Sequence, residues 1–241
     1  MSLFKFHGDK GKGAFKDDMP SLEKWLSSHF DVGPTHLAGR DILEIGCGRG
    51  GFCVFAALNG ADRVVGIDLN QKLIDSCQKN VGTHYPQLQD KIEFYPHALS
   101  HLEHEKFVFV FSKNVFEHVD DLPDLLQQIK CRLKQNGRVY ASFGPLWTSP
   151  FGDHRRFHRK LAKTSGYSCP QFIFPWSHLI ISKSRFVRII NYLSQNDTID
   201  STYSGINKLS YSEYLSILKN SGFSITELGI NKTQTLSAPH N

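Results

Sequence analysis

Short apolar runs alternate with amphipathic segments between residues 41 and 143. The runs are short and bounded by polar or glycine-containing turns, and they predict strands at 41–46, 62–68, 91–95, 107–112 and 138–143. The amphipathic segments predict helices at 50–60, 70–82 and 120–137, the last with an apolar stripe that reaches Leu133 and with Gly137 as its expected end. Strands without strict alternation, separated by amphipathic helices, indicate an α/β fold with a doubly wound, mostly parallel sheet.

The flanking parts of the chain carry weaker patterns. Residues 21–30 predict a helix, and residues 210–222 predict another because Ser210 and Glu213 match a capping box. Residues 223–230 predict a late strand. We therefore expect one domain over residues 1–241, made of an N-terminal cap and helix (1–40), a ligand-binding core (41–143), an aromatic-rich lid insertion (144–207) and a C-terminal helix and strand (208–241).

A glycine-rich turn follows the first expected strand, in the stretch LEIGCGRGG. Gly46, Gly48 and Gly51 match GxGxxG, and Asp68 ends the next strand about 20 residues on, as in a dinucleotide site. Glu44, two residues before Gly46, distinguishes ligands that carry phosphate from ligands that carry a positive charge. A carboxylate repels a pyrophosphate but attracts an ammonium or a sulfonium group, so this turn favours S-adenosylmethionine.

Several segments together resemble a known family. LEIGCGRGG, VVGIDLN, HALS and SKNVFEHVDDLPDLLQQIK are similar to successive signature segments of class I S-adenosylmethionine-dependent methyltransferases, closest to the type 11-like group that acts on small molecules. The resemblance implies a seven-stranded type of sheet, in which this chain's last strand is short or missing. It also implies S-adenosylmethionine as the cofactor.

The resemblance assigns cofactor contacts residue by residue. It implies a methionine-side loop of Glu44, Gly46, Cys47, Gly48 and Gly50. It implies that Asp68 holds the ribose and that the adenine is bordered by Leu69, His97, Ala98 and Leu99. The methionine and its methyl group would be lined by Ser112, Lys113 and Asn114. His97 departs from the pattern, since the family often has an acidic residue there.

Methyl transfer to oxygen needs a base, and histidine is suited to that role near neutral pH. His118 follows the fourth expected strand, His154 begins the insertion and His178 lies within it. Each is a catalytic candidate, although a histidine is more often a surface or packing residue. The spacing of His154, His158 and His178 with Asp153 fits no standard zinc pattern, so we expect no metal. The aromatic residues of the insertion favour an apolar or ring-containing small-molecule acceptor.

Composition limits the kinds of partner and the cellular location that we expect. The net charge of +5 is mild and no basic domain stands out, so we do not expect a nucleic-acid substrate. No apolar run approaches the roughly 20 residues that cross a membrane, and residues 1–16 lack the apolar core of a secretory signal. The five cysteines form no CxxC pair, which fits reduced thiols and a cytoplasmic location. Two other functions stay open: an NAD-dependent oxidoreductase, and a non-catalytic module that binds S-adenosylmethionine.

Overall fold

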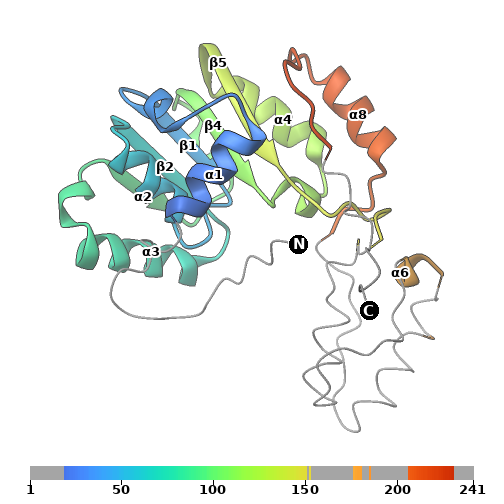
Figure 1. Ribbon diagram of the computed structural model, residues 1–241, viewed down its shortest axis with the longest axis horizontal. Coiled ribbons are helices and arrows are strands. Elements are labelled where there is room, and N and C mark those ends of the chain that lie inside the picture. The colour runs from blue at the N-terminus through green and yellow to red at the C-terminus, as the bar shows by residue number, and fades with distance from the viewer. Residues whose placement is uncertain (1–18, 151, 153–175, 181–184, 186–205, 231–241) are drawn as a thin grey trace, which may run out of the picture. The chain divides into compact units, whose positions relative to one another are not determined.

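The computed structural model describes residues 19–150, 152, 176–180, 185 and 206–230, and Figure 1 shows the arrangement of their elements. In chain order the elements are α1 (Met19–His29), η1 (Pro34–Leu37), β1 (Asp41–Ile45), α2 (Gly51–Leu58), β2 (Arg63–Ile67), α3 (Gln71–His84), η2 (Pro86–Leu88), β3 (Ile92–Tyr95), η3 (Leu99–Leu102), β4 (Phe107–Lys113), η4 (Phe116–His118), α4 (Leu122–Cys131), β5 (Leu133–Ser142), α6 (Ser177–Ile180) and α8 (Tyr211–Asn220). Most of the expected lid insertion, including His154, lies outside the described residues.

The described strands form one five-stranded parallel sheet in the order β3-β2-β1-β4-β5. β1 pairs with β2 from Asp41 opposite Arg63 to Ile45 opposite Ile67. All but the first residue of β1 and of β2 are buried, which explains why neither strand alternates between apolar and polar residues. The prediction of an α/β fold with a parallel sheet is confirmed. The strand order reverses between β1 and β4, which is the point where sheets of this kind bind ligands at the carboxyl ends of the strands.

The described residues divide into two compact units, of which the first contains residues 19–110, 133–140 and 224–230. In this unit α2 packs against β1, β2 and β3, while α3 packs against β3 (Figure 1). Helix α1 packs on α2, and the rings of Trp25 and Phe52 meet edge to face with centroids 5.8 Å apart. Asn70 caps α3, since its side-chain oxygen accepts a hydrogen bond from the Lys72 N–H.

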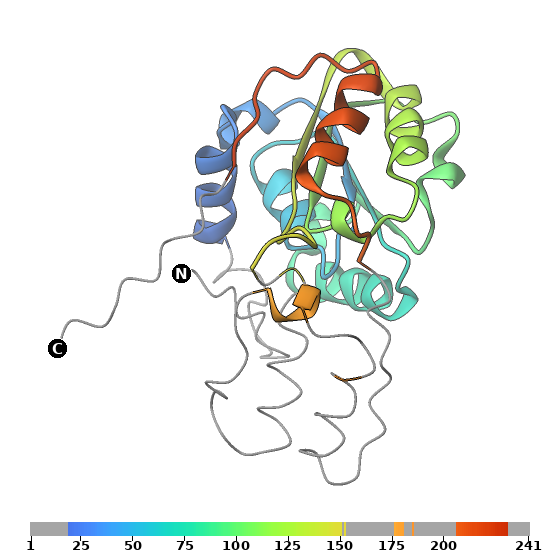
Figure 2. The same ribbon diagram turned by 90° about the vertical axis from the view of Figure 1, so that its right-hand side faces the viewer.

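The second unit contains residues 111–132 and the described residues between 141 and 223. Helices α4 and α8 lie side by side in both Figure 1 and Figure 2, and the Gln127 side chain donates a hydrogen bond to the Ser221 carbonyl. The expected capping box at the start of α8 is confirmed, with the Ser210 hydroxyl accepting from the Glu213 N–H and the Glu213 carboxylate accepting from the Ser210 N–H.

Two expected elements differ from the structure. Helix α4 ends at Cys131 instead of Gly137, and Leu133 already belongs to β5. The turn forms at Arg132, whose N–H bonds the Ile129 carbonyl and whose guanidinium donates to the Gln128 carbonyl, so the last turn of α4 is closed there. The prediction of a strand at 223–230 is wrong, because these residues form no regular structure and all but Phe223 are exposed.

None of the helices within the described residues is both long and apolar enough to span a lipid bilayer.

Candidate functional site

The glycine turn connects β1 to α2 and is fixed to the end of β2. The N–H groups of Gly46 and Cys47 both donate to the Ile67 carbonyl, at 2.8 and 2.9 Å, and the Gly50 N–H donates to the Cys47 carbonyl. Gly50 has a φ of +79° and caps α2. A Cβ at this position would lie 2.8 Å from Cζ of Phe94, so the turn requires glycine here.

Gly48 has a φ of +54°, and a Cβ built there would meet no atom of the described residues within 4 Å. The backbone of the turn is therefore uncovered at Gly48, whereas it is covered at Gly50 by the Phe94 ring. An uncovered glycine backbone at the start of a helix lets a ligand approach closely, and the N-terminus of α2 supplies positive potential.

Glu44 lies in β1 and is only 7% exposed. Its Oε2 atom accepts a hydrogen bond from the Cys53 thiol of α2, at 3.0 Å. The structure thus places a carboxylate beside the glycine turn, as the sequence predicts.

Asp68 follows β2 and ties the turn to the next loop. Its Oδ2 atom accepts a hydrogen bond from the Gly48 N–H at 3.0 Å, and its Oδ1 atom accepts from the Asn70 N–H at 2.9 Å. The carboxylate is half-buried and keeps lone pairs for further donors. Glu44, Gly46, Cys47, Gly48, Gly50 and Asp68 are therefore brought together in the first unit.

Three buried cysteines surround the same turn. The Cys47 thiol lies within hydrogen-bonding reach of Cys53 and Cys77, and the Cys77 thiol donates to the Gly48 carbonyl at 3.3 Å. Burial, with Glu44 nearby, raises the pKa of Cys53 to about 12. These thiols are therefore protonated donors and packing groups at neutral pH. Cys131, by contrast, is exposed.

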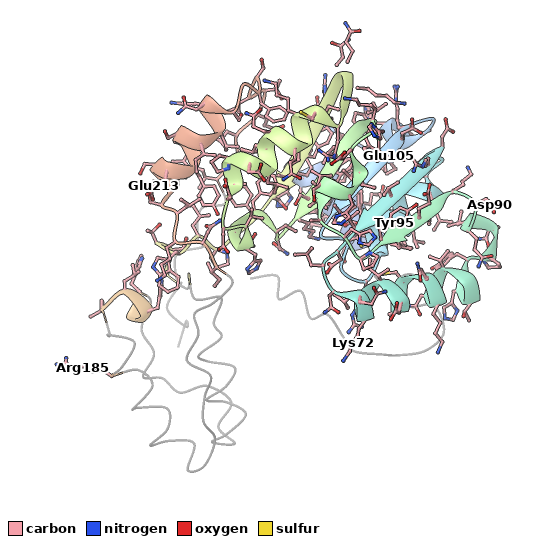
Figure 3. The ribbon with its side chains drawn as sticks, turned by 180° about the vertical axis from the view of Figure 1, so that it is seen from behind. Lys72, Asp90, Tyr95, Glu105, Arg185 and Glu213 are labelled. Atoms are coloured by element: carbon pink, nitrogen blue, oxygen red, sulfur yellow. The ribbon has the colours of Figure 1, made fainter. Side chains whose placement is uncertain are left out.

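The residues expected at the adenine lie in the first unit but differ in exposure. Leu69 is 79% exposed and lines a shallow depression with Asp68, Asn70, Gln71 and Lys72, of which Lys72 is labelled in Figure 3. His97 and Ala98 are exposed, and Leu99 is buried at the start of η3. The His97 ring stacks on His101 with centroids 4.6 Å apart.

A charged cluster lies on the same unit and holds β2 and β3 to the loop before β4. The Arg63 guanidinium forms ion pairs with Glu93 and Glu105, both at 2.6 Å, and the Tyr95 hydroxyl donates to Glu93. Tyr95 and Glu105 are labelled in Figure 3. These contacts keep the pKa of Glu93 below its ordinary value, chiefly through the hydrogen bond from Arg63.

Ser112, Lys113 and Asn114, expected at the methionine, belong to the second unit. Ser112 is buried and Lys113 ends β4. Asn114 has a φ of +57°, and its N–H donates to the Ser142 carbonyl at 2.8 Å.

The three candidate histidines differ in exposure and in whether the structure describes them. His118 ends η4 and is exposed, and His154 lies outside the described residues. His178, in α6, is 7% exposed, and its Nε2 atom lies 2.6 Å from the Trp147 carbonyl oxygen. Because a carbonyl only accepts, Nε2 carries the hydrogen and Nδ1 is the acceptor of the neutral ring. Among the described residues, no three His, Cys, Asp or Glu side chains are grouped so as to hold a metal ion.

Glu117 was not among the sequence candidates, yet it is a buried carboxylate in the second unit. It is 1% exposed, and its Oε1 atom accepts a hydrogen bond from the Gly144 N–H at 3.0 Å. Burial raises the pKa of Glu117 above its ordinary value. Its position four residues after β4, between Phe116 and His118, was the available signal.

Residues 43–141 match the methyltransferase domain family. The ubiquinone biosynthesis O-methyltransferase of Paraburkholderia phymatum is 30% identical over 128 residues, which are 51% of this chain and 50% of that protein. The tRNA U34 carboxymethyltransferase of Idiomarina loihiensis is 29% identical over 119 residues, 48% of this chain and 36% of that protein. The chain thus spans half or less of the length of these curated relatives.

A solved S-adenosylmethionine-dependent methyltransferase from Mesorhizobium loti has the same fold. The match covers 87% of this chain and 84% of that one, with a TM-score of 0.53 and 18% identity. Residues 43–141 thus match a methyltransferase domain by sequence, and the chain shares its fold with a solved S-adenosylmethionine-dependent methyltransferase. S-adenosylmethionine is the cofactor that these similarities imply.

The residues present fit that cofactor. The uncovered backbone at Gly48 allows close approach, and two carboxylates lie beside the turn, Glu44 in β1 and Asp68 after β2. S-adenosylmethionine carries an ammonium group and two ribose hydroxyls but no phosphate, so both carboxylates have a matching partner on it.

Proposed function

We propose that this protein transfers a methyl group from S-adenosylmethionine to an oxygen atom of a small molecule. The observation that carries the proposal is the buried Glu44 carboxylate beside the uncovered glycine turn. A phosphate charge 4 Å from this carboxylate would be repelled by about 4 kcal/mol at an effective dielectric constant of 20. The same distance favours an ammonium group by a similar amount, which supports the methyl donor over a dinucleotide.

When bound, the cofactor supplies an electrophilic methyl carbon on a sulfonium. In this proposal Glu44 binds the ammonium group, and Asp68 accepts hydrogen bonds from the ribose hydroxyls. The hydrogen bonds from Gly48 and Asn70 hold the Asp68 carboxylate in place before the cofactor arrives, which reduces the entropy lost on binding. His97, Ala98 and Leu99 are proposed to border the adenine, and Ser112, Lys113 and Asn114 to line the methionine.

His178 is the proposed base for an oxygen acceptor. The Trp147 carbonyl holds Nε2–H and so leaves Nδ1 ready to receive a proton, and the Trp147 ring packs edge to face on the imidazole with centroids 4.8 Å apart. A ring held in one orientation and one tautomer suits general-base catalysis. His118 and His154 remain proposed alternatives to His178.

The acceptor class is proposed from the relatives and from the charge of the chain. One matching relative is named an O-methyltransferase and another modifies tRNA, so the acceptor has to be tested in both classes. We favour a small molecule because the net charge of +5 includes no concentrated basic domain. A cytoplasmic location is proposed because the four described cysteines are thiols and not disulfides.

Calorimetry on the full chain tests the cofactor. We expect S-adenosylmethionine to bind and NAD not to bind. Asp68→Ala should weaken S-adenosylmethionine binding about tenfold or more, because it removes the acceptor of two ribose hydroxyls. Asp90→Ala is the matched control, an exposed aspartate of the same unit that is labelled in Figure 3, and should leave affinity unchanged. NAD binding without S-adenosylmethionine binding would overturn the proposal.

The acceptor is tested by incubating the full chain and methyl-labelled S-adenosylmethionine with a metabolite extract and, separately, with bulk tRNA. We expect label in a small-molecule methyl ether, identified by mass spectrometry. With that acceptor, His178→Gln should lower kcat by about 10²-fold or more and leave cofactor affinity unchanged. Label in tRNA alone would contradict the proposed acceptor class.

A further inference from the structure

Glu117 has one hydrogen-bonded carboxylate oxygen and one that is not. Oε1 accepts from the Gly144 N–H, whereas Oε2 is buried and has no hydrogen-bond partner. Among the described residues it is the one buried side-chain oxygen or nitrogen in this condition. An unpartnered buried carboxylate oxygen costs about 1–3 kcal/mol or more, so its presence requires an explanation.

The polar groups of Asn207 and Tyr214 near Glu117 are hydrogen-bonded, in contrast to Oε2. The Asn207 N–H donates to the Glu117 carbonyl at 2.8 Å, and the Asn207 amide group donates to the carbonyls of Phe116 and Val119 at 2.7 and 2.8 Å. The Tyr214 hydroxyl donates to Oδ1 of Asn207 at 2.7 Å. This network connects the turn after β4 to residues 207 and 214, while Oε1 of Glu117 connects it to Gly144.

The network fixes Glu117 without using Oε2. The Phe143 ring packs between the rings of Phe116 and Tyr214, with centroids 5.4 and 4.9 Å away. Glutamine would serve the Gly144 N–H equally well and would avoid the cost of a buried charge. A carboxylate in this position is therefore better explained by what its second oxygen binds than by the packing of the unit.

We propose that Oε2 of Glu117 accepts a hydrogen bond from a hydroxyl group of the methyl acceptor, which makes Glu117 a specificity-determining residue. The proposal rests on the proposed function. Glu117 follows the carboxyl end of β4 by four residues, and parallel α/β sheets bind their ligands beyond these ends. A hydroxyl is favoured over an ammonium group because its desolvation among aromatic rings costs much less.

Matched ring compounds test this assignment. Phenols and their methyl ethers differ only by the hydrogen that Oε2 would accept, and a site built to bond a hydroxyl rejects the analogue that lacks it. We would measure the affinities of a library of such pairs for the full chain by ligand-observed NMR. In the wild type we expect phenols to bind at least about tenfold more tightly than their ethers.

Glu117→Gln is the decisive variant. Its amide oxygen keeps the Gly144 hydrogen bond, and its amide N–H group replaces Oε2 as a donor that serves phenol and ether oxygens alike. The preference for phenols should therefore fall to about threefold or less. Glu213→Gln is the matched control, a carboxylate of the same unit in the capping box of α8, labelled in Figure 3, and should keep the wild-type preference.

Equal binding of phenols and ethers by the wild type, or no binding of either, overturns the proposal without any variant. So does an unchanged preference in Glu117→Gln when circular dichroism shows it folded. If that variant does not fold, the wild-type comparison decides. Failure of the proposed function is seen separately, because calorimetry measures S-adenosylmethionine binding and Glu117 is not among the residues proposed to hold the cofactor.

Discussion

A glycine in such a turn can be needed for its left-handed backbone or for the close approach of a ligand. Replacing Gly48 by alanine tests these two reasons separately. At Gly48 the backbone is left-handed, with a φ of +54°, but a Cβ would meet no atom within 4 Å. The only cost to the free protein is the conformation, about 1–2 kcal/mol for an L-residue. If the cofactor approaches this backbone, the new methyl group also occupies part of its space.

Two other glycines provide the comparison. Gly39 has a φ of +69° and equally open space, but it lies in the loop before β1, away from the turn. Alanine there should cost the same 1–2 kcal/mol or so of stability. At Gly50 the Cβ would also lie 2.8 Å from Cζ of Phe94 and 3.1 Å from the Cys77 sulfur. Overlap with buried groups adds about 1–3 kcal/mol, so Gly50→Ala should lose about 2–5 kcal/mol.

Urea unfolding and calorimetry measure the two effects on the same variants. Gly39→Ala and Gly48→Ala should lose similar amounts of stability, but only Gly48→Ala should lose cofactor affinity, by about tenfold or more, which corresponds to ~1.4 kcal/mol. Gly50→Ala should show the largest loss of stability of the three. Equal affinities of Gly39→Ala and Gly48→Ala for S-adenosylmethionine would refute the assignment of the turn as the cofactor's binding surface.

Three further predictions concern the packing of each unit, and urea unfolding measures all of them. Cys53→Ala should lower the free energy of unfolding by about 1.5–3 kcal/mol, because it removes the thiol that donates to Glu44, while the exposed Cys131→Ala should change it by less than about 0.5 kcal/mol. Asn207→Ala leaves several buried groups unpartnered and should cost about 2–4 kcal/mol, against almost nothing for the exposed Asn220→Ala. Burial raises the pKa of Tyr214 from 10 to about 12. Its protonated form therefore stabilises the fold fully below pH 10, and this contribution, at most about 2.7 kcal/mol, is lost between pH 10 and 12 in the wild type but not in Tyr214→Phe.

The glycine turn and the two carboxylates beside it, which form the proposed cofactor site, were predictable because short stretches of chain create them. Apolar residues on both faces of β1 and β2 mark buried parallel strands, and the glycines between them mark a turn that only a few conformations can form. Glu44 and Asp68 take their places from the ends of these strands, so their proximity follows from topology and needs no knowledge of distant contacts.

Element boundaries were less predictable where the spacing of apolar residues typical of a helix or strand continues over residues that do not form that element. Leu133 continues the helical spacing from Ile129, yet the chain leaves the helix at Arg132 and Leu133 is half-buried in β5. Residues 223–230 have an apolar pattern suited to a strand, but Ile225 and Leu228 are 42% and 51% exposed. Strand propensity is expressed only where a neighbouring strand offers hydrogen bonds and a surface to pack on.

Glu117 shows why the acceptor side could not be predicted in the same way. A charged residue is almost never fully buried, so the sequence favours an exposed Glu117 beside the exposed His118. It is buried because Gly144, 27 residues away, and Asn207, 90 residues away, close around it. Local sequence determines the turn that is proposed to bind the cofactor, while long-range contacts determine that one oxygen of the Glu117 carboxylate is left without a hydrogen bond among the described residues. Acceptor choice is therefore expected to change between relatives through these contacts while the glycine turn stays the same, and the phenol–ether preference of Glu117→Gln measures the first without disturbing the second.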